Sequence, residues 1–158
     1  MKPASDPALL AALNAERAAL LSFMALLERE QGMLVENNAE QLLELSEQKS
    51  TEAIRLNELA NTRRTLLKKY LPQLGVEAIR NWLSANNPEG LPVWKEILVL
   101  AERAAQTNRT NGELIQMKLR HNQQALTALS NAANKANLYG PDGQTSFSSG
   151  SGRSLGSG

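Results

Sequence analysis

Residues 91–137 are LPVWKEILVLAERAAQTNRTNGELIQMKLRHNQQALTALSNAANKAN. Apolar residues recur through this stretch at three- and four-residue steps, and charged or amide side chains fill most of the positions between them. Because an α-helix repeats every 3.6 residues, this spacing lines the apolar groups along the side of a helix. We therefore predict one helix from about Leu91 to about Asn137, on the order of 65 to 70 Å long. A helix of that length must span or project beyond the rest of a chain of 158 residues.

The middle of this predicted helix is polar. Four short polar residues stand just before Gly112, namely Thr107, Asn108, Thr110 and Asn111. Such residues and Gly weaken a helix interior. Either Gly112 lets a neighbouring helix approach closely while Asn111 hydrogen-bonds across the interface, or the helix kinks there as a hinge. We favour close packing with an Asn that sets the register.

Two long helices are predicted upstream. Asp6 followed by Pro7 is typical of a helix start, because Asp caps free N–H groups and Pro fits the first helical position. Asn38, three residues before a Gln, caps a second helix that we expect from Ala39 to about Tyr70, with the boundary at about residues 35–38. The first helix carries one apolar row of Leu10, Leu13, Leu20, Met24, Leu27 and Leu34, beside a second row of Leu9, Phe23 and Leu26.

Two cations interrupt the apolar row of the second helix. Lys49 and Arg63 occupy heptad positions among Leu42, Leu45, Leu56, Leu59, Leu66 and Tyr70. Charges in a helix interface lower stability unless their alkyl stems pack and their heads reach water, and in exchange they can fix the register between helices. Arg63 also belongs to a group of cations with Arg64, Lys68 and Lys69 near the end of this helix, for which a solvated helix end is the favoured interpretation.

The remaining segments complete the predicted architecture. Pro72 ends the second helix, and residues 76–85 form a short corner helix before a turn at residues 86–90. Residues 140–158 are rich in Gly and Ser and cannot bury enough apolar surface to offset the entropy of ordering. The prediction is an all-α fold: an elongated antiparallel bundle of three long helices plus the corner helix, with left-handed coiled-coil-like packing. A helical domain spans residues 1–139, and residues 140–158 are a flexible, disordered C-terminal tail.

The composition argues against catalysis. The chain has no Cys and one His, so disulfides, thiolate chemistry and the usual structural zinc sites are excluded. Any scheme that needs imidazole rests on His121, which we expect to be an ordinary surface residue. The carboxylate pairs Glu28/Glu30 and Glu44/Glu47 are expected to be solvated surface groups. We predict no enzyme activity, no metal site and no cofactor.

Charge and hydropathy bound the location and the partners. Residues 1–62 hold five Lys and Arg against ten Asp and Glu, whereas residues 63–158 hold twelve against six. Internal complementarity is the favoured interpretation, and nucleic-acid binding is the weaker one. We find neither a signal peptide nor a run that approaches the roughly 20 apolar residues of a membrane span. A cytoplasmic protein without membrane insertion is expected.

The last helix carries more apolar groups than one internal interface needs. They spread over more than one side of the helix, and a helix of another protein is expected to dock there. Met117 adds an adaptable thioether of the kind found on surfaces that accept several ligands, although a helical Met is more often part of a core. The candidates for partner binding are Leu114, Ile115, Met117, Leu119, Leu126 and Leu129.

Two segments, LLELSEQKS at residues 42–50 and NRTNGELIQMKLRHNQQALTALSNAANKANLYGPDGQ at residues 108–144, carry a resemblance. They are similar to the FlgN family of flagellar type III export chaperones, and the likeness covers the chain from about residue 8 to Gln144. Its most specific parts are Asn111-Gly112 with Leu114-Ile115, Gln124-Ala125-Leu126 with Leu129, and the closing run from Leu138 to Gln144.

The resemblance implies a function. Members of this family bind hook-associated proteins of the hook–filament junction in the cytoplasm, protect their C-terminal helices from premature assembly and deliver them to the export gate or ATPase complex. It places cargo binding in the C-terminal part, at Leu114, Ile115, Leu119, Leu126 and Leu129, and implies that Tyr139 contributes to docking at the export apparatus. A coiled-coil adaptor or dimerising scaffold would show the same heptads, and the sequence leaves a homodimer open.

Overall fold

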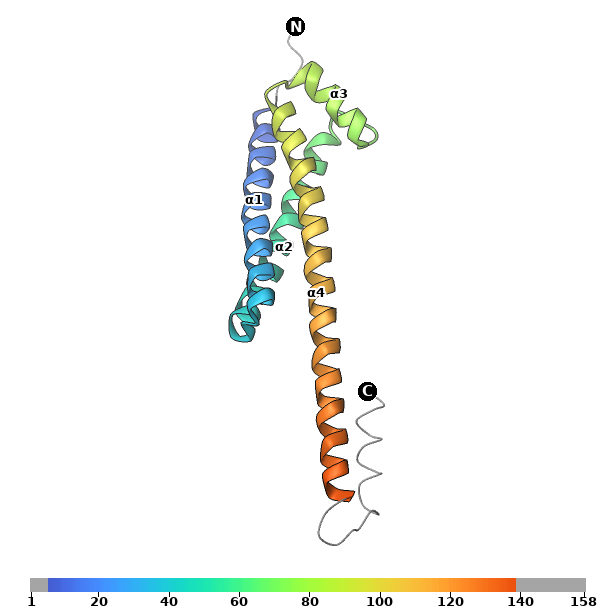
Figure 1. The fold of residues 1–158 in the computed structure, drawn as a ribbon. Coiled ribbons are helices and arrows are strands. Elements are labelled where there is room, and N and C mark those ends of the chain that lie inside the picture. Colours follow the sequence, from blue (N-terminus) through green and yellow to red (C-terminus); the bar gives the residue numbers. More distant parts are fainter. Residues whose placement is uncertain (1–5, 139–158) are drawn as a thin grey trace. The chain divides into compact units, whose positions relative to one another are not determined.

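The structure is a computed structural model that describes the backbone of residues 6–138 and the side chains of residues 6–132. It contains four helices and, within these residues, no strand: α1 (Pro7–Glu36), α2 (Ala39–Leu67), α3 (Val76–Asn86) and α4 (Gly90–Leu138) (Figure 1). The all-α prediction is confirmed. The chain divides into a first compact unit that ends at Gly112 and a second that begins at Glu113. The predicted tail at residues 140–158 lies outside the described residues.

Side-chain caps set the start of the first two helices. Asp6 Oδ1 accepts hydrogen bonds from the backbone N–H groups of Ala8 and Leu9, at 3.0 and 3.4 Å. Asn37 adopts a left-handed conformation with φ of 60° and ends α1, and Asn38 Oδ1 then accepts from the N–H of Gln41 at 3.5 Å. Both predicted N-caps and the predicted boundary are confirmed.

The second helix ends three residues earlier than predicted. Beyond Leu67 the backbone tightens, because the N–H groups of Lys69 and Tyr70 bond to carbonyls only three residues back. The Tyr70 side chain contacts Asp6, the N-cap of α1, and Trp82 of α3. Its hydroxyl donates to Asp6 Oδ2 at 2.8 Å, and its ring stacks on Trp82 of α3 at 4.6 Å.

The apolar core lies in the first unit and draws on all four helices. The predicted main row of α1 is buried from Leu13 onward, whereas Leu10 is only partly buried and Leu9 takes its place. Gly90, predicted within a turn, is the first residue of α4, and a Cβ there would lie 3.1 Å from Leu13 Cδ1. The core comprises Leu9, Leu13, Leu20, Met24, Leu27, Leu67, Ile79, Leu83, Val93, Trp94, Ile97, Leu100 and Ala104.

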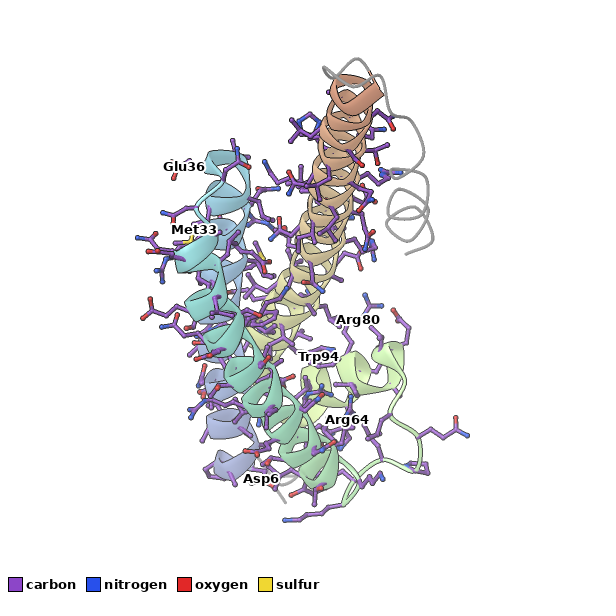
Figure 2. The ribbon with its side chains drawn as sticks, turned by 90° about the horizontal axis from the view of Figure 1, so that it is seen from below. Asp6, Met33, Glu36, Arg64, Arg80 and Trp94 are labelled. Carbon is purple, nitrogen blue, oxygen red and sulfur yellow. The ribbon has the colours of Figure 1, made fainter. Side chains whose placement is uncertain are left out.

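Polar pairs show how the helices of the first unit run. Glu16 bonds to Arg63 and Glu30 to Lys49, so α2 runs antiparallel to α1. Asp6 and Glu36 mark the two ends of α1 (Figure 2). Because Glu96 bonds to Arg17 and Asn111 bonds to Glu30, the first part of α4 runs parallel to α1. The three-helix bundle over the whole length of α4 and its left-handed coiled-coil packing stay predictions.

The Glu16–Arg63 pair is buried inside this core. Arg63 Nε lies 2.7 Å from Glu16 Oε1 and Nη2 lies 3.2 Å from Oε2, with 9% and 5% of the two residues exposed. The guanidinium also lies over the Trp94 ring, 4.9 Å from its centroid. Two parallel hydrogen bonds and an aromatic face compensate for the water that both charges lose. Such a pair fixes the position of α2 along α1 at this point of the bundle.

The α1 helix corrects the expectation about membrane spans. By length and composition it is apolar enough to cross a membrane, with a mean hydropathy of 1.4 over an 18-residue window. Its apolar row faces the core of the first unit, and the carboxylates of Glu16 and Glu30 are buried on it in ion pairs with α2. The buried helix of a folded domain passes the same composition test, so hydropathy alone does not assign this helix to a membrane.

We expect Arg63→Ala to lower the free energy of unfolding by about 3 to 5 kcal/mol, because Glu16 would keep its charge in the core without a partner. Urea unfolding followed by circular dichroism measures the change. Arg64→Ala is the matched control, because Arg64 (labelled in Figure 2) is exposed and its guanidinium donates to Asn61 Oδ1 on the same helix. Equal losses in both variants would contradict a stabilising role for the buried pair.

The bond between Tyr70 and Asp6 predicts a dependence of stability on pH. The hydrogen bond from Tyr70 is the main cause that lowers the pKa of Asp6 below its ordinary 3.8, and the same bond raises the pKa of Tyr70 above its ordinary 10.0. The stability from the Asp6 carboxylate is therefore present above pH 3.8 and is lost as the pH falls through the lowered pKa. The stability from the Tyr70 hydroxyl is present below pH 10.0 and is lost as the pH rises through the raised pKa.

Tyr70→Phe tests this expectation. The difference in unfolding free energy between wild type and variant should be constant between about pH 5 and about pH 8 and should shrink in acid. Urea titrations at several pH values measure it. A difference that keeps its size in acid, below the pKa of Asp6 in both the folded and the unfolded protein, would show that the hydrogen bond does not depend on the ionisation of Asp6.

Candidate functional site

The candidate site is the surface of α4 that follows Gly112. Leu114, the first predicted binding residue there, is partly buried. Tyr139 lies outside the described residues. The other five are exposed large apolar side chains: Ile115 (37%), Met117 (57%), Leu119 (57%), Leu126 (61%) and Leu129 (68%). Among the described residues, this segment therefore carries the longest series of exposed apolar groups on one helix.

Helical geometry separates these residues into faces. At 100° per residue, Ile115, Leu119, Leu126 and Leu129 fall within about 80° of the circumference of α4. We call these four residues the apolar row. Met117 falls on the opposite side of the helix, and Leu114 lies about 100° from the centre of the row. The predicted set is thus one row of four residues, with Leu114 outside its margin and Met117 on the opposite side of the helix.

Asn111 precedes the row and is completely buried in the first unit. Its Nδ2 donates to the Leu27 carbonyl oxygen at 2.9 Å and to Glu30 Oε1 at 2.8 Å. Glu30 Oε1 also accepts from Lys49 Nζ at 3.2 Å, so one carboxylate joins α1, α2 and α4. This is the hydrogen bond across the interface that we favoured.

The proposed role of Gly112 is wrong. A Cβ at this position would meet nothing within 4 Å, so the glycine does not serve a close approach of helices. The backbone is helical on both sides, because α4 continues from Gly90 to Leu138. The polar middle of α4 is therefore attached to α1 by the hydrogen bonds of Asn111 and not by close packing at Gly112.

The site offers binding chemistry and no reactive constellation. Within residues 6–138, no three His, Asp or Glu side chains gather in a way that could hold a metal ion. His121 is exposed, as predicted for a surface residue. The apolar row consists of aliphatic side chains, which can bury surface against a partner and cannot transfer protons or electrons.

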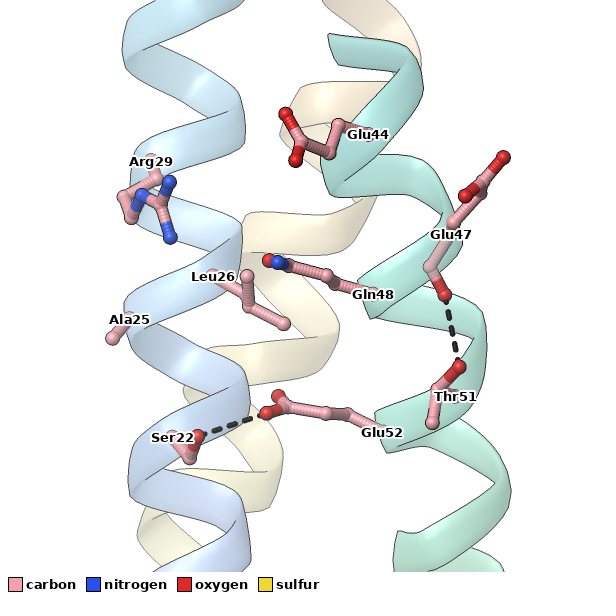
Figure 3. Close-up of a pocket in the computed structure, with 9 residues that line it drawn as sticks. All are labelled: Ser22, Ala25, Leu26, Arg29, Glu44, Glu47, Gln48, Thr51 and Glu52. Atoms are coloured by element: carbon pink, nitrogen blue, oxygen red, sulfur yellow. Dashed lines mark hydrogen bonds between the residues drawn. The ribbon is translucent and has the colours of Figure 1, made fainter. Parts of the chain in front are cut away.

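A concave surface lies between α1 and α2, apart from the apolar row (Figure 3). This cleft of about 720 Å³ is lined mainly by polar side chains, three of them glutamates, with Leu26 buried at its base. Ser22 Oγ donates to Glu52 Oε1 at 3.0 Å across it. An acidic cleft of this kind suits neither an apolar helix nor a nucleic-acid backbone. Its lining residues are Ser22, Ala25, Leu26, Arg29, Glu44, Glu47, Gln48, Thr51 and Glu52.

Comparisons with known proteins agree with the resemblance. A family profile described as FlgN protein matches residues 1–146. The chain belongs to the FlgN family. A flagella synthesis protein FlgN of Yersinia enterocolitica is 37% identical over 112 residues, which cover 71% of this chain and 70% of the relative. The FlgN of Yersinia enterocolitica serotype O:8 / biotype 1B (strain NCTC 13174 / 8081) gives the same values. No solved structure matches the chain.

Family membership gives this FlgN protein a role as a flagellar synthesis chaperone. The prediction that both members of the Glu28/Glu30 pair are solvated is wrong for Glu30. Glu30 is buried and bonds to both Lys49 and Asn111. Its position held a clue, since it lies three residues after Leu27 and four before Leu34, in step with the buried row of α1.

We expect Asn111→Ala to lower the free energy of unfolding of this protein by about 1 to 3 kcal/mol, because the buried Glu30 carboxylate would lose a donor. Urea unfolding measures the loss. Asn108→Ala is the control, since Asn108 is an exposed residue one turn earlier on the same helix. Similar values for the two variants would mean that the Asn111 bonds contribute nothing specific.

Proposed function

We propose that this FlgN protein is a cytoplasmic export chaperone for flagellar hook-associated proteins of the hook–filament junction. It binds their C-terminal helical segments, prevents their premature assembly and delivers them to the gate or ATPase complex of the type III export apparatus. The protein works without catalysis, cofactor, nucleic acid or membrane insertion. Its cargo-binding surface is the apolar row with Leu114 at its margin, whereas Met117, predicted with them, projects from the opposite side of the same segment, and Tyr139 contributes to docking at the export apparatus.

The exposed apolar row of α4 is the observation that supports this proposal. Four aliphatic side chains, with exposed fractions from 37% to 68%, lie along one side of one helix. Burial of such a row is favourable, and an amphipathic helix of a partner supplies a matching row at the same spacing. A cargo segment that would otherwise polymerise can thus hide its own apolar side until it is exported.

The finer architecture belongs to the same proposal. A helical domain at residues 1–139 forms an antiparallel bundle of three long helices with coiled-coil-like packing, and residues 140–158 are a tail. In this arrangement the first unit supplies stability, and the C-terminal part of α4 supplies the binding surface. Binding to a single helix is expected to be of moderate affinity, because ordering of the partner offsets part of the contact energy.

A coiled-coil adaptor or dimerising scaffold is the alternative function. The heptad spacing of the apolar row favours it, because two copies of one helix can pair through such a row. Sedimentation equilibrium of the full chain separates the two functions. A stable dimer that dissociates when the row is mutated supports the scaffold, and a monomer that binds hook-associated proteins supports the chaperone.

Copurification of the full chain with hook-associated proteins from the same cell tests the proposal. We expect Leu126→Asp and Leu129→Asp each to weaken binding at least about tenfold, because a buried carboxylate without a partner opposes the interface. Circular dichroism should show unchanged helicity, since both side chains are exposed in the free protein.

Gln124→Asp and Asn131→Asp are the matched controls. Both residues are exposed on the opposite side of α4, so they add the same charge to the same segment without touching the apolar row. Binding should survive in both. The proposed function is refuted when the two row variants bind cargo as well as the wild type, or when the controls lose binding equally.

A further inference from the structure

Asn122 interrupts the apolar row of α4. The positions Ile115, Leu119, Asn122, Leu126 and Leu129 follow one another at steps of four, three, four and three residues, which is the spacing of a coiled-coil seam. Asn122 therefore occupies the central seam position, and its amide is exposed in the free chain. A helix that docks on the row must cover this amide together with the four aliphatic side chains.

A covered Asn side chain needs a polar partner. An amide buried against an apolar residue loses its bonds to water and gains none, which weakens binding by about tenfold or more. In coiled coils one Asn in the seam therefore selects the register and the partner that place a polar group opposite it. The inner part of α4 already shows this behaviour, because Asn111, eleven residues earlier, is buried only with the Glu30 carboxylate and the Leu27 carbonyl as acceptors.

The charge of this segment further restricts which partner helices can bind. Residues 114–132 contain Lys118 and Arg120 and no Asp or Glu. Lys118 directly precedes Leu119, at a position that flanks the seam, whereas Arg120 lies about 140° from the centre of the row and adds only to the net positive charge of the segment. A partner with carboxylates beside its own apolar row is attracted to this segment, whereas a second copy would bring like charges together.

We propose that the apolar row selects an acidic amphipathic helix of another protein, one that presents a polar side chain opposite Asn122. This inference rests on the proposed function and specifies which helices the same surface accepts. The aliphatic residues supply most of the binding. Asn122 sets the register by penalising every alignment that puts an apolar residue at its level, and the basic flank favours carboxylates on the partner.

Synthetic helical peptides of about four heptads test this preference on the full chain. Each peptide carries Leu at its other seam positions. The peptides differ in their flanking positions, which hold Glu or Lys, and in the central seam position, which holds Asn or Leu. Titration calorimetry measures the dissociation constants. For wild type we expect the peptide with Glu flanks and Asn to bind at least about tenfold more tightly than its Leu counterpart. Lys flanks should weaken binding, and added salt should reduce that difference.

Asn122→Leu should reverse the preference at the central position, so that the Leu peptide becomes the tighter ligand by a similar factor. Asn131→Leu is the matched control, because Asn131 is exposed on the opposite side of α4 and should leave the preference unchanged. A loss of the preference for the Asn peptide in Asn122→Leu cannot come from the added hydrophobicity alone, because Asn131→Leu adds the same side chain elsewhere on the helix.

Four outcomes overturn the inference. Wild type fails to discriminate between Asn and Leu peptides, or peptides with Lys flanks bind as tightly as those with Glu flanks, or no peptide binds to the folded chain. Dimerisation of the chain through this row, lost in Leu126→Asp, overturns it as well. When cargo copurifies and is lost in Leu126→Asp while the peptides are not discriminated, the proposed function stands and only the inference about its partner fails.

Discussion

The carboxylate of Glu30 is the point at which three helices of the first unit are tied together. It accepts hydrogen bonds from Lys49 Nζ of α2 and from Asn111 Nδ2 of α4, while its own backbone belongs to α1. A buried carboxylate is tolerated only where donors surround it, so the three helices must meet at this level and at no other. Displacement by one turn in any of them would leave a charge or an amide in the interior without a partner.

A second polar level lies nearer the other end of α1. Glu16 and Arg63 pair inside the apolar core, and Trp94 of α4 covers the guanidinium. Leucines can interdigitate at several registers with similar energy, whereas a bidentate ion pair satisfies both groups at one register only. Two such levels on α1 therefore specify the alignment of helices whose apolar residues are mostly Leu, Ile and Ala. Stability comes from the apolar burial and uniqueness from the polar pairs.

The same helix that contributes Asn111 to this junction continues for more than twenty residues beyond it. Leu119, Leu126 and Leu129 there are exposed, and a row of exposed apolar side chains commonly serves a partner. Membership of the FlgN family gives that surface a context in flagellum synthesis. The chain thus combines a first unit whose buried helices are tied by polar pairs with a segment of α4 whose exposed apolar row, in our proposal, binds a helix of another protein.

Local sequence determined the secondary structure of this protein. Asp6 and Asn38 cap their helices, and each helix begins and ends within three residues of its predicted limits, because caps, Pro and periodicity act over a single turn. The residues of the apolar row were also found from the sequence, since their excess over one interface is a matter of spacing.

Tertiary structure alone decided which polar residues are buried. The spacing of Glu16 and Glu30 places both in step with buried leucines of α1, but only the approach of Arg63, Lys49 and Asn111 from other helices makes their burial favourable. Gly112 looked like a point of close contact and has open space around it, because the distance between two helices depends on side chains far apart in the chain.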